Sequence, residues 1–181
     1  MKRSHFLKTA LKDYKVGAVM ESSRYTVQKI VSFLKPEHKF IIEYGAGNGT
    51  ITKKLLQRLP EASQIIAIES NENFINELSK ITDPRIKIVC GDVVVFLRNF
   101  LPTESAQIDA VISGIPFSFL KPALREEIVH RTHDLLSDRG MLLVYQHSVL
   151  ILPLLKKYFA KTKVFFEPRN ILPYFIMRAE K

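Results

Sequence analysis

The chain has a single cysteine and no tryptophan, and it lacks any apolar run long enough to span a membrane. One cysteine, Cys90, excludes an internal disulfide and is typical of a reducing compartment. A membrane-spanning helix needs about 20 consecutive apolar residues. Residues 1–20 also lack the continuous apolar core of a signal peptide. We therefore expect a cytoplasmic protein.

Acidic residues are few relative to basic ones. The chain has 18 Asp and Glu against 27 Lys and Arg, which gives a formal net charge of +9. An excess of positive charge favours an anionic partner, either nucleic acid or an acidic membrane surface, and composition does not choose between them. A chain of 181 residues with 46% hydrophobic content can bury a core as one domain.

Short β-branched runs alternate with segments of helical periodicity from residue 39 onward. Near-continuous apolar strands separated by helices predict a parallel sheet with helices on both faces. Two further runs near the end have no helix between them and predict an antiparallel pair. The expected fold is Rossmann-like α/β with a mostly parallel seven-stranded sheet. The strands are expected at 39–45, 64–70, 86–92, 107–114, 140–147, 163–168 and 171–180, and the helices at 50–59, 71–80, 92–100 and 121–136.

Two helical segments precede the first strand and form an expected N-terminal unit, residues 1–35, before the main domain, residues 36–181. Residues 22–34 begin with two serines that can cap a helix. Residues 2–15 place apolar side chains on one helical face and lysines on the other. This helix either packs on the domain or lies on an anionic membrane surface.

A glycine-rich turn follows the first predicted strand. Glu43 ends the strand, and Gly45, Gly47 and Gly49 follow at alternate positions before a helix. Glycines allow a close approach between backbone and ligand, and the start of a helix offers free amide groups. A dinucleotide fingerprint has its third glycine one position later, so the turn alone does not define the ligand.

Acidic residues end the next two strands as well, Glu69 the second and Asp92 the third. Three acids at successive strand ends, with glycines after the first, resemble class I S-adenosylmethionine-dependent methyltransferases over residues 39–147. The resemblance implies S-adenosylmethionine as cofactor and no metal. Gly17, Ser22 and Ser23 either contact the methionine carboxylate or form an ordinary helix cap. The expected cofactor-binding residues are Gly17, Ser22, Ser23, Glu43, Gly45, Ala46, Gly47, Asn48, Gly49, Glu69, Ser70, Asp92, Val93 and Ser113.

The fourth strand ends in Gly114-Ile115-Pro116-Phe117. Amino methyltransferases of this fold carry Asn/Asp/Ser-x-Pro-aromatic here, and Gly114 takes the place of the Asn of adenine N6-methyltransferases. The chain thus resembles the rRNA adenine dimethyltransferases in outline but lacks the side chain that accepts protons from adenine.

Residues 15–30, 109–117 and 169–176 resemble segments of bacterial phospholipid N-methyltransferases. This resemblance implies methylation of phosphatidylethanolamine by a monomer at the inner face of the cell membrane, with the N-terminal helix on the anionic surface. Leu172 replaces a proline of the family pattern, and residues 144–148 also depart from it. RNA adenine methylation, small-molecule amine methylation and a non-catalytic cofactor-binding scaffold are the alternatives.

A lipid amine has a pKa near about 10, so freeing its lone pair at neutral pH costs roughly 4 kcal/mol unless the site lowers that pKa. Candidate bases are Tyr25, Tyr145 and His147, although His147 is also a candidate helix cap. Phe117 either walls the acceptor or packs in the core, and Arg169 with Asn170 either contact lipid phosphate or close the last hairpin. The expected acceptor-binding residues are Gly114, Ile115, Pro116, Phe117, Arg169 and Asn170.

Overall fold

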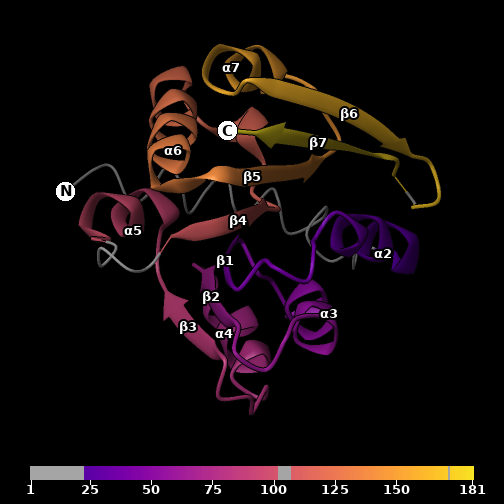
Figure 1. The fold of residues 1–181 in the computed structure, drawn as a ribbon, viewed down its shortest axis with the longest axis vertical. Helices are drawn as coiled ribbons and strands as arrows, with labels where there is room; N and C mark the ends of the chain where they lie inside the picture. The colour runs from indigo at the N-terminus through magenta and orange to yellow at the C-terminus, as the bar shows by residue number, and fades with distance from the viewer. Residues whose placement is uncertain (1–22, 102–106, 171) are drawn as a thin grey trace.

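Seven strands form one sheet in the order β3-β2-β1-β4-β5-β7-β6 (Figure 1). The computed structural model describes residues 23–101, 107–170 and 172–181, so the expected helix at 2–15, Gly17 and Ser22 lie outside the described residues. β1 to β5 pair in parallel, and β7 runs antiparallel to both β5 and β6. The predicted fold class is confirmed. The strands are β1 (Phe40–Tyr44), β2 (Gln64–Glu69), β3 (Ile86–Cys90), β4 (Ile108–Ser113), β5 (Leu136–Gln146), β6 (Lys161–Glu167) and β7 (Tyr174–Glu180).

Helices cover both faces of the sheet, because each strand alternates its side chains between two apolar layers. On one face lie α2 (Arg24–Ser32), α3 (Thr50–Arg58) and α4 (Glu72–Leu78), and on the other lie α5 (Val93–Asn99), α6 (Pro122–Leu135) and α7 (Leu152–Tyr158). Figure 1 shows α2 and α3 on the opposite side of the sheet from α5 and α6.

Helix α2 packs into the same core as the main domain. Ser23 caps it by accepting a hydrogen bond from the Thr26 amide, 3.3 Å. Val27 and Ile30 are buried in the layer that also contains Leu55 of α3. Among the described residues, no helix is both long and apolar enough to cross a bilayer.

Two elements differ from the sequence expectation. β5 begins at Leu136, four residues before the predicted strand, because Leu136 is buried and pairs with Ile108 across a register shift. The 3-10 helix η1 (Phe117–Phe119) lies where no element was predicted, and helix α7, which the sequence expected to begin at His147, begins at Leu152. Both follow the carboxyl ends of strands, so they shape the edge of the sheet where ligands bind in folds of this kind.

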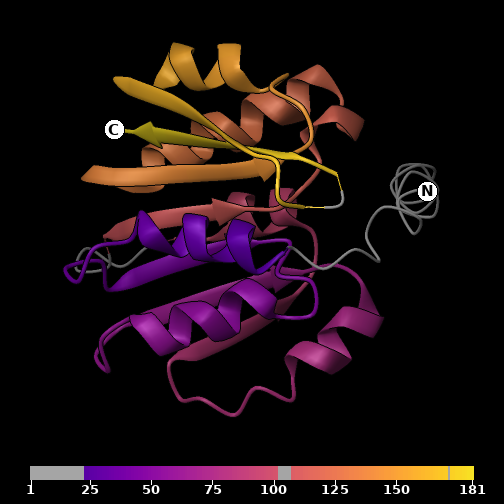
Figure 2. The same ribbon diagram turned by 90° about the vertical axis from the view of Figure 1, so that its right-hand side faces the viewer.

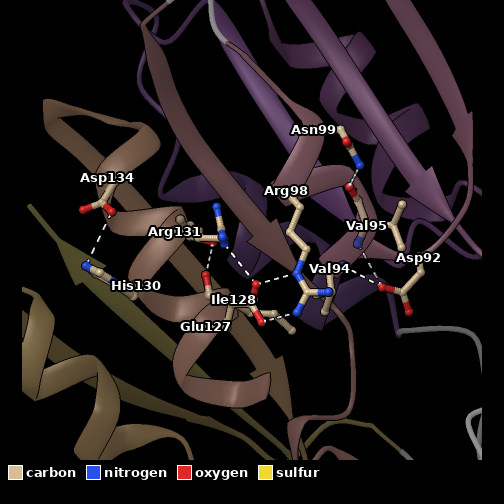
Figure 3. A network of polar contacts seen from close by, with 11 residues as sticks. Asp92, Val94, Val95, Arg98, Asn99, Glu127, Ile128, His130, Arg131 and Asp134 are labelled. Carbon is tan, nitrogen blue, oxygen red and sulfur yellow. Dashed lines mark hydrogen bonds and ion pairs between the residues drawn. The ribbon is translucent and has the colours of Figure 1, made fainter. Parts of the chain in front are cut away.

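An ion-pair network holds α5 against α6 on the face of the sheet that α5, α6 and α7 cover (Figure 3). The Arg98 guanidinium pairs with both carboxylate oxygens of Glu127, each at 2.7 Å, and Arg131 donates to the same carboxylate at 3.1 Å. The hydrogen bonds from Arg98 lower the pKa of Glu127 to about 2. The network holds the last turn of α5, which contains Arg98, and Asp92 caps the start of the same helix.

Candidate active site

The glycine turn between β1 and α3 has the backbone that its glycines permit. Gly45, Gly47 and Gly49 have φ values of 70°, 56° and 81°, a region that L side chains rarely adopt. The amides of Gly45 and Ala46 both donate to the Ile68 carbonyl, at 2.8 and 3.1 Å, which folds the turn onto the end of β2.

Gly49 and Gly47 are required for different reasons. A Cβ on Gly49 would lie 2.8 Å from methyl groups of Leu78 and Ile81, so this position is closed by packing. A Cβ on Gly47 would meet no atom within 4 Å. Gly47 therefore borders open space in which the backbone can approach a ligand. Asn48 accepts from both the amide and the hydroxyl of Thr50 and supports the start of α3.

Glu69 joins the turn to the end of β2. One carboxylate oxygen accepts from the Gly47 amide at 2.8 Å, and the other accepts from the amides of Ser70 and Asn71 at 2.8 and 2.9 Å. The side chain is 9% exposed. A carboxylate has about four lone-pair directions, so capacity remains for ligand hydroxyls beyond these three bonds. The expected contact with ribose stays a prediction.

Glu43 is completely buried at the end of β1. The Thr52 hydroxyl donates to its Oε2 at 2.6 Å, whereas Oε1 has no hydrogen-bond partner among the described residues. Burial raises the pKa of Glu43 to about 8, and the nearby Glu69 charge acts in the same direction against the Thr52 bond. A buried polar atom without a partner is rare, and a ligand bound at this strand end would supply one.

Asp92 caps α5 at the third strand end. Its Oδ1 accepts from the amides of Val94 and Val95, at 2.7 and 3.3 Å. Val93 is 8% exposed, and its side chain belongs to the apolar core on the face covered by α5 and α6. Ser113 is fully buried, and its hydroxyl has no partner among the described residues.

The loop after β4 lies directly against the glycine turn. A Cβ on Gly45 would lie 3.1 Å from Cγ2 of Ile115 and 3.7 Å from the carbonyl carbon of Gly114. The Gly114 amide donates to the Tyr44 carbonyl, 2.9 Å, one residue before Gly45. The structure thus brings the expected cofactor turn and the expected acceptor loop together.

Tyr145 of β5 fills the space beside Gly114. A Cβ on residue 114 would overlap the Tyr145 hydroxyl and lie 2.6 Å from Cζ of the ring. Because the Tyr145 side chain is 9% exposed, it cannot withdraw from this position without repacking. The tyrosine hydroxyl therefore occupies the volume that a side chain at position 114 would fill.

Phe117 lies in the core and not on the surface of the loop. Its side chain is 1% exposed and packs within the layer covered by α5 and α6, so the wall that sequence reasoning considered is not formed by this ring. The Phe117 amide donates to Oε1 of buried Gln146, 3.2 Å, and the same side chain donates to the Ser148 carbonyl, 2.6 Å. Gln146 thereby ties the loops after β4 and β5 together, and Pro116 precedes η1 as its N-cap.

His147 is placed by a residue of β7 that sequence reasoning did not include. Its ring is stacked on Tyr174 at 4.2 Å between centroids, and the Tyr174 ring meets Tyr145 edge-on at 5.8 Å. The His147 Nδ1 lies 2.9 Å from the Pro173 carbonyl, so it must carry the proton and donate. α7 is capped by Ile151, and His147 is therefore not a helix cap.

Tyr25 lies at the beginning of α2 between two arginines. Arg24 donates to its hydroxyl at 2.8 Å, and the Arg169 guanidinium lies 4.5 Å from the ring centroid. Asn170 of the β6–β7 turn accepts from the Ser23 amide at 2.8 Å and donates to the Leu172 carbonyl. The Asn170 side chain therefore closes the β6–β7 turn, which is one of the two roles that the sequence had left open, and it also joins the turn to α2.

Tyr174, Gln146 and Arg24 were missed because nothing in their local pattern marks them. Tyr174 comes beside Tyr145 through the antiparallel pairing of β7 with β5, and Arg24 reaches Arg169 across 145 positions of the chain. Long-range pairing of this kind has no local sequence signal. Placing Tyr174 beside Tyr145 therefore requires knowledge of the strand order.

Comparison with known proteins agrees with this geometry. A family model described as a methyltransferase domain matches residues 41–140. An rRNA methyltransferase of Streptomyces thermotolerans is 36% identical over 98 residues, which cover 52% of this chain and 29% of the relative. The chain thus spans less than a third of that protein's length.

Two further matches extend over more of the chain. An ornithine lipid N-methyltransferase of Singulisphaera acidiphila is 26% identical over 144 residues, covering 75% of this chain and 72% of the relative. The crystal structure of a precorrin-6y C5,15-methyltransferase from Geobacter metallireducens superimposes with a TM-score of 0.73 at 17% identity, covering 90% and 92% of the two chains. The latter shows the fold.

The glycine turn, the acids at three strand ends and the unpartnered Glu43 oxygen fit S-adenosylmethionine, which supplies a methyl group on a positively charged sulfur when bound. Glu43, Gly47, Glu69 and Asp92 are the residues that would hold it. With the family model matching more than half of its length, the chain belongs to the methyltransferase-domain family, and its cofactor is S-adenosylmethionine.

Proposed function

We propose that the protein is an N-methyltransferase of phosphatidylethanolamine-type lipid head groups. The observation that carries this proposal is the pairing of Gly114 with Tyr145. Residue 114 offers no side chain at the end of β4, and the hydroxyl of Tyr145 occupies that volume. An adenine amine needs an acceptor such as Asn there, whereas an aliphatic amine has a lone pair of its own once it is deprotonated.

Methyl transfer from a sulfonium to an amine is an in-line displacement, so the protein mainly contributes positioning and the exclusion of water. The amine must first lose a proton. The Tyr145 hydroxyl lies beside Gly114 of the acceptor loop, and in this proposal it accepts a hydrogen bond from the acceptor's ammonium group. The ammonium proton passes to water, and His147, which is stacked on Tyr174 and exposed to solvent, lies at the same edge of the site as a candidate acceptor for it.

A lipid acceptor is supported by two further observations. One relative, which matches 75% of this chain, is an ornithine lipid N-methyltransferase. The chain also carries a net charge of +9, which favours contact with an anionic membrane. We propose that residues 2–15 make this contact as a basic amphipathic helix at the inner membrane surface. We also propose that the enzyme works there as a monomer.

RNA adenine methylation is the second candidate. The match to an rRNA methyltransferase and the positive charge favour it. Gly114 argues against it, because the position that carries the acceptor Asn in adenine N6-methyltransferases is occupied here by the Tyr145 ring and hydroxyl.

Transfer of labelled methyl groups separates the two candidates. The full chain is incubated with labelled S-adenosylmethionine and, in parallel, vesicles of phosphatidylethanolamine with phosphatidylglycerol, vesicles of phosphatidylglycerol alone, and rRNA. We expect label in the first vesicles only. Label in rRNA without label in lipid would overturn the proposal. Deletion of residues 1–15 should abolish vesicle binding and leave S-adenosylmethionine binding unchanged, and vesicle binding that survives the deletion would refute the role of that helix.

A further inference from the structure

A cluster of two arginines and one tyrosine lies where α2 begins and the β6–β7 turn closes over it. The Cζ atoms of Arg24 and Arg169 are 4.8 and 4.5 Å from the ring centroid of Tyr25. Figure 2 shows the start of α2 and the β6–β7 turn at the same end of the molecule. Two cations on one ring repel each other, and an anion that contacts both relieves this repulsion.

The buried carboxylate of Glu167 holds the Arg169 guanidinium in place. Its Nε and Nη2 donate to the two carboxylate oxygens of Glu167 at 2.7 and 2.8 Å, and its backbone amide donates to the same carboxylate at 3.1 Å. Glu167 is 3% exposed, whereas the Arg169 side chain is 60% exposed. A buried carboxylate therefore orients a guanidinium that still reaches solvent.

Arg24 leaves the cluster with a net positive charge. Within residues 23–101, 107–170 and 172–181, it forms no ion pair with an acid, while the charge of Arg169 is balanced by Glu167. The hydrogen bond from the Ser23 amide to Asn170, 2.8 Å, keeps the two arginines together, because it joins the residue before Arg24 to the residue after Arg169. The amino end of α2 adds a favourable dipole for an anion.

The cluster and the proposed methyl-acceptor site flank the same residue of β7. Glu167, which holds Arg169, is the cross-strand partner of Tyr174. The Tyr174 ring meets the Tyr145 ring at 5.8 Å, and Tyr145 fills the space beside Gly114. An acceptor whose amine lies at Tyr145 would therefore extend toward Arg169 along the carboxyl edge of the sheet.

We propose that Arg24 and Arg169, presented on the ring of Tyr25, bind the phosphodiester of the methyl acceptor. The inference rests on the proposed function and names the part of the substrate that this cluster recognises. Guanidinium groups match phosphate oxygens with paired, charge-assisted hydrogen bonds. Tyr25 then serves as a platform for the arginines, and Glu167 acts as a positioning residue for Arg169.

A lipid phosphodiester is favoured over that of RNA by the surface beside the cluster. Leu172 follows Asn170 in the same turn and is 51% exposed, which offers an apolar contact next to the phosphate site. An RNA backbone would need further cations along its path. A glycerophospholipid needs one anion site with apolar surface beside it.

Binding of short-chain lipids tests the proposal. Dihexanoyl phosphatidylethanolamine is titrated into the full chain by calorimetry, in parallel with a dihexanoyl amine lipid that lacks phosphate. We expect Arg24→Gln and Arg169→Gln each to weaken the phosphate-bearing lipid by about 10-fold or more. Neither change should alter the affinity for the phosphate-free lipid or for S-adenosylmethionine. Arg139→Gln removes the same charge from an exposed position near the start of β5 and should change none of these affinities.

Each outcome decides one question. Equal weakening of both lipids by the arginine variants, or no weakening of either, overturns the phosphate site. Loss of binding to a single-stranded RNA oligonucleotide without loss of lipid binding assigns the cluster to RNA and also overturns it. Wild-type binding of the phosphate-bearing lipid that depends on both arginines, without methyl transfer to its amine, supports the phosphate site and refutes the proposed methyl acceptor instead.

Discussion

Gly114 and Tyr145 share one volume at the carboxyl end of β4, because a Cβ on residue 114 would overlap the tyrosine hydroxyl. The two residues therefore constrain each other. Any side chain at 114 must displace the Tyr145 ring, which is 9% exposed and has little room to move. The acceptor chemistry of the site is consequently set by a tyrosine on the neighbouring strand.

The shared volume predicts energetic coupling between the two positions. Gly114→Ala should lower the free energy of unfolding by about 1–3 kcal/mol in the wild-type background, since it forces overpacking. In a Tyr145→Ala background the same change should cost less than about 0.5 kcal/mol, because the ring is gone. Urea unfolding of the four proteins measures the coupling. An equal cost in both backgrounds would show that the ring does not occupy this volume.

The Tyr145 hydroxyl should contribute to the chemical step and not to cofactor binding. Tyr145→Phe keeps the ring and should reduce kcat for the lipid amine by about 10²-fold or more, with an unchanged Kd for S-adenosylmethionine. Tyr158→Phe is the matched control, because its hydroxyl donates to Glu126 on the face of the sheet that α5, α6 and α7 cover. Full activity of Tyr145→Phe would exclude the hydroxyl from proton transfer.

The glycine turn should separate ligand binding from folding. Gly47→Ala places a Cβ in open space, so we expect at least about 10-fold weaker S-adenosylmethionine binding and a loss of stability of about 1–2 kcal/mol from its positive φ. Gly49→Ala pushes a Cβ against Leu78 and Ile81 and should destabilise the fold by more than Gly47→Ala does. Calorimetry and thermal unfolding measure the two effects. The opposite order would contradict the placement of the open space.

Glu43 should make the stability of the ligand-free protein depend on pH. Its pKa is raised by burial from 4.5 to about 8, so the folded state keeps a proton that the unfolded state releases over this interval. The free energy of unfolding should therefore fall as pH rises from about 4.5 to about 8, by up to about 4 kcal/mol. Glu43→Gln should remove this contribution. Chemical unfolding of both proteins across the interval tests it, and parallel profiles would refute it.

Local patterns were sufficient to predict the fold and to select residues that the structure brings together at the glycine turn. Alternating apolar runs predict the parallel strands, and the three acids with their glycines occur within about 50 positions of one repeating βα unit, which brings strand ends together automatically. Glu43, Gly47 and Glu69 were found in this way, and the structure places them together.

The acceptor side depends on pairing that the sequence does not encode locally. Gly114 was recognised as a missing side chain, but its partner Tyr145 was identified only as one of three candidate bases. Tyr174 enters through the antiparallel β5–β7 register, and Phe117 turned out to be a core residue because η1 turns its ring inward. Residues 2–15 lie outside the described residues, so the membrane helix stays a prediction.

The most direct test of the account is the identity of the methylated atom. Dihexanoyl phosphatidylethanolamine and an rRNA fragment are offered together to the enzyme with S-adenosylmethionine, and both are analysed by mass spectrometry with fragmentation. We predict methyl groups on the lipid amine nitrogen and none on RNA. Methyl groups on adenine, with the lipid unmodified, would contradict the central claim that Gly114 and Tyr145 form a site for an aliphatic amine.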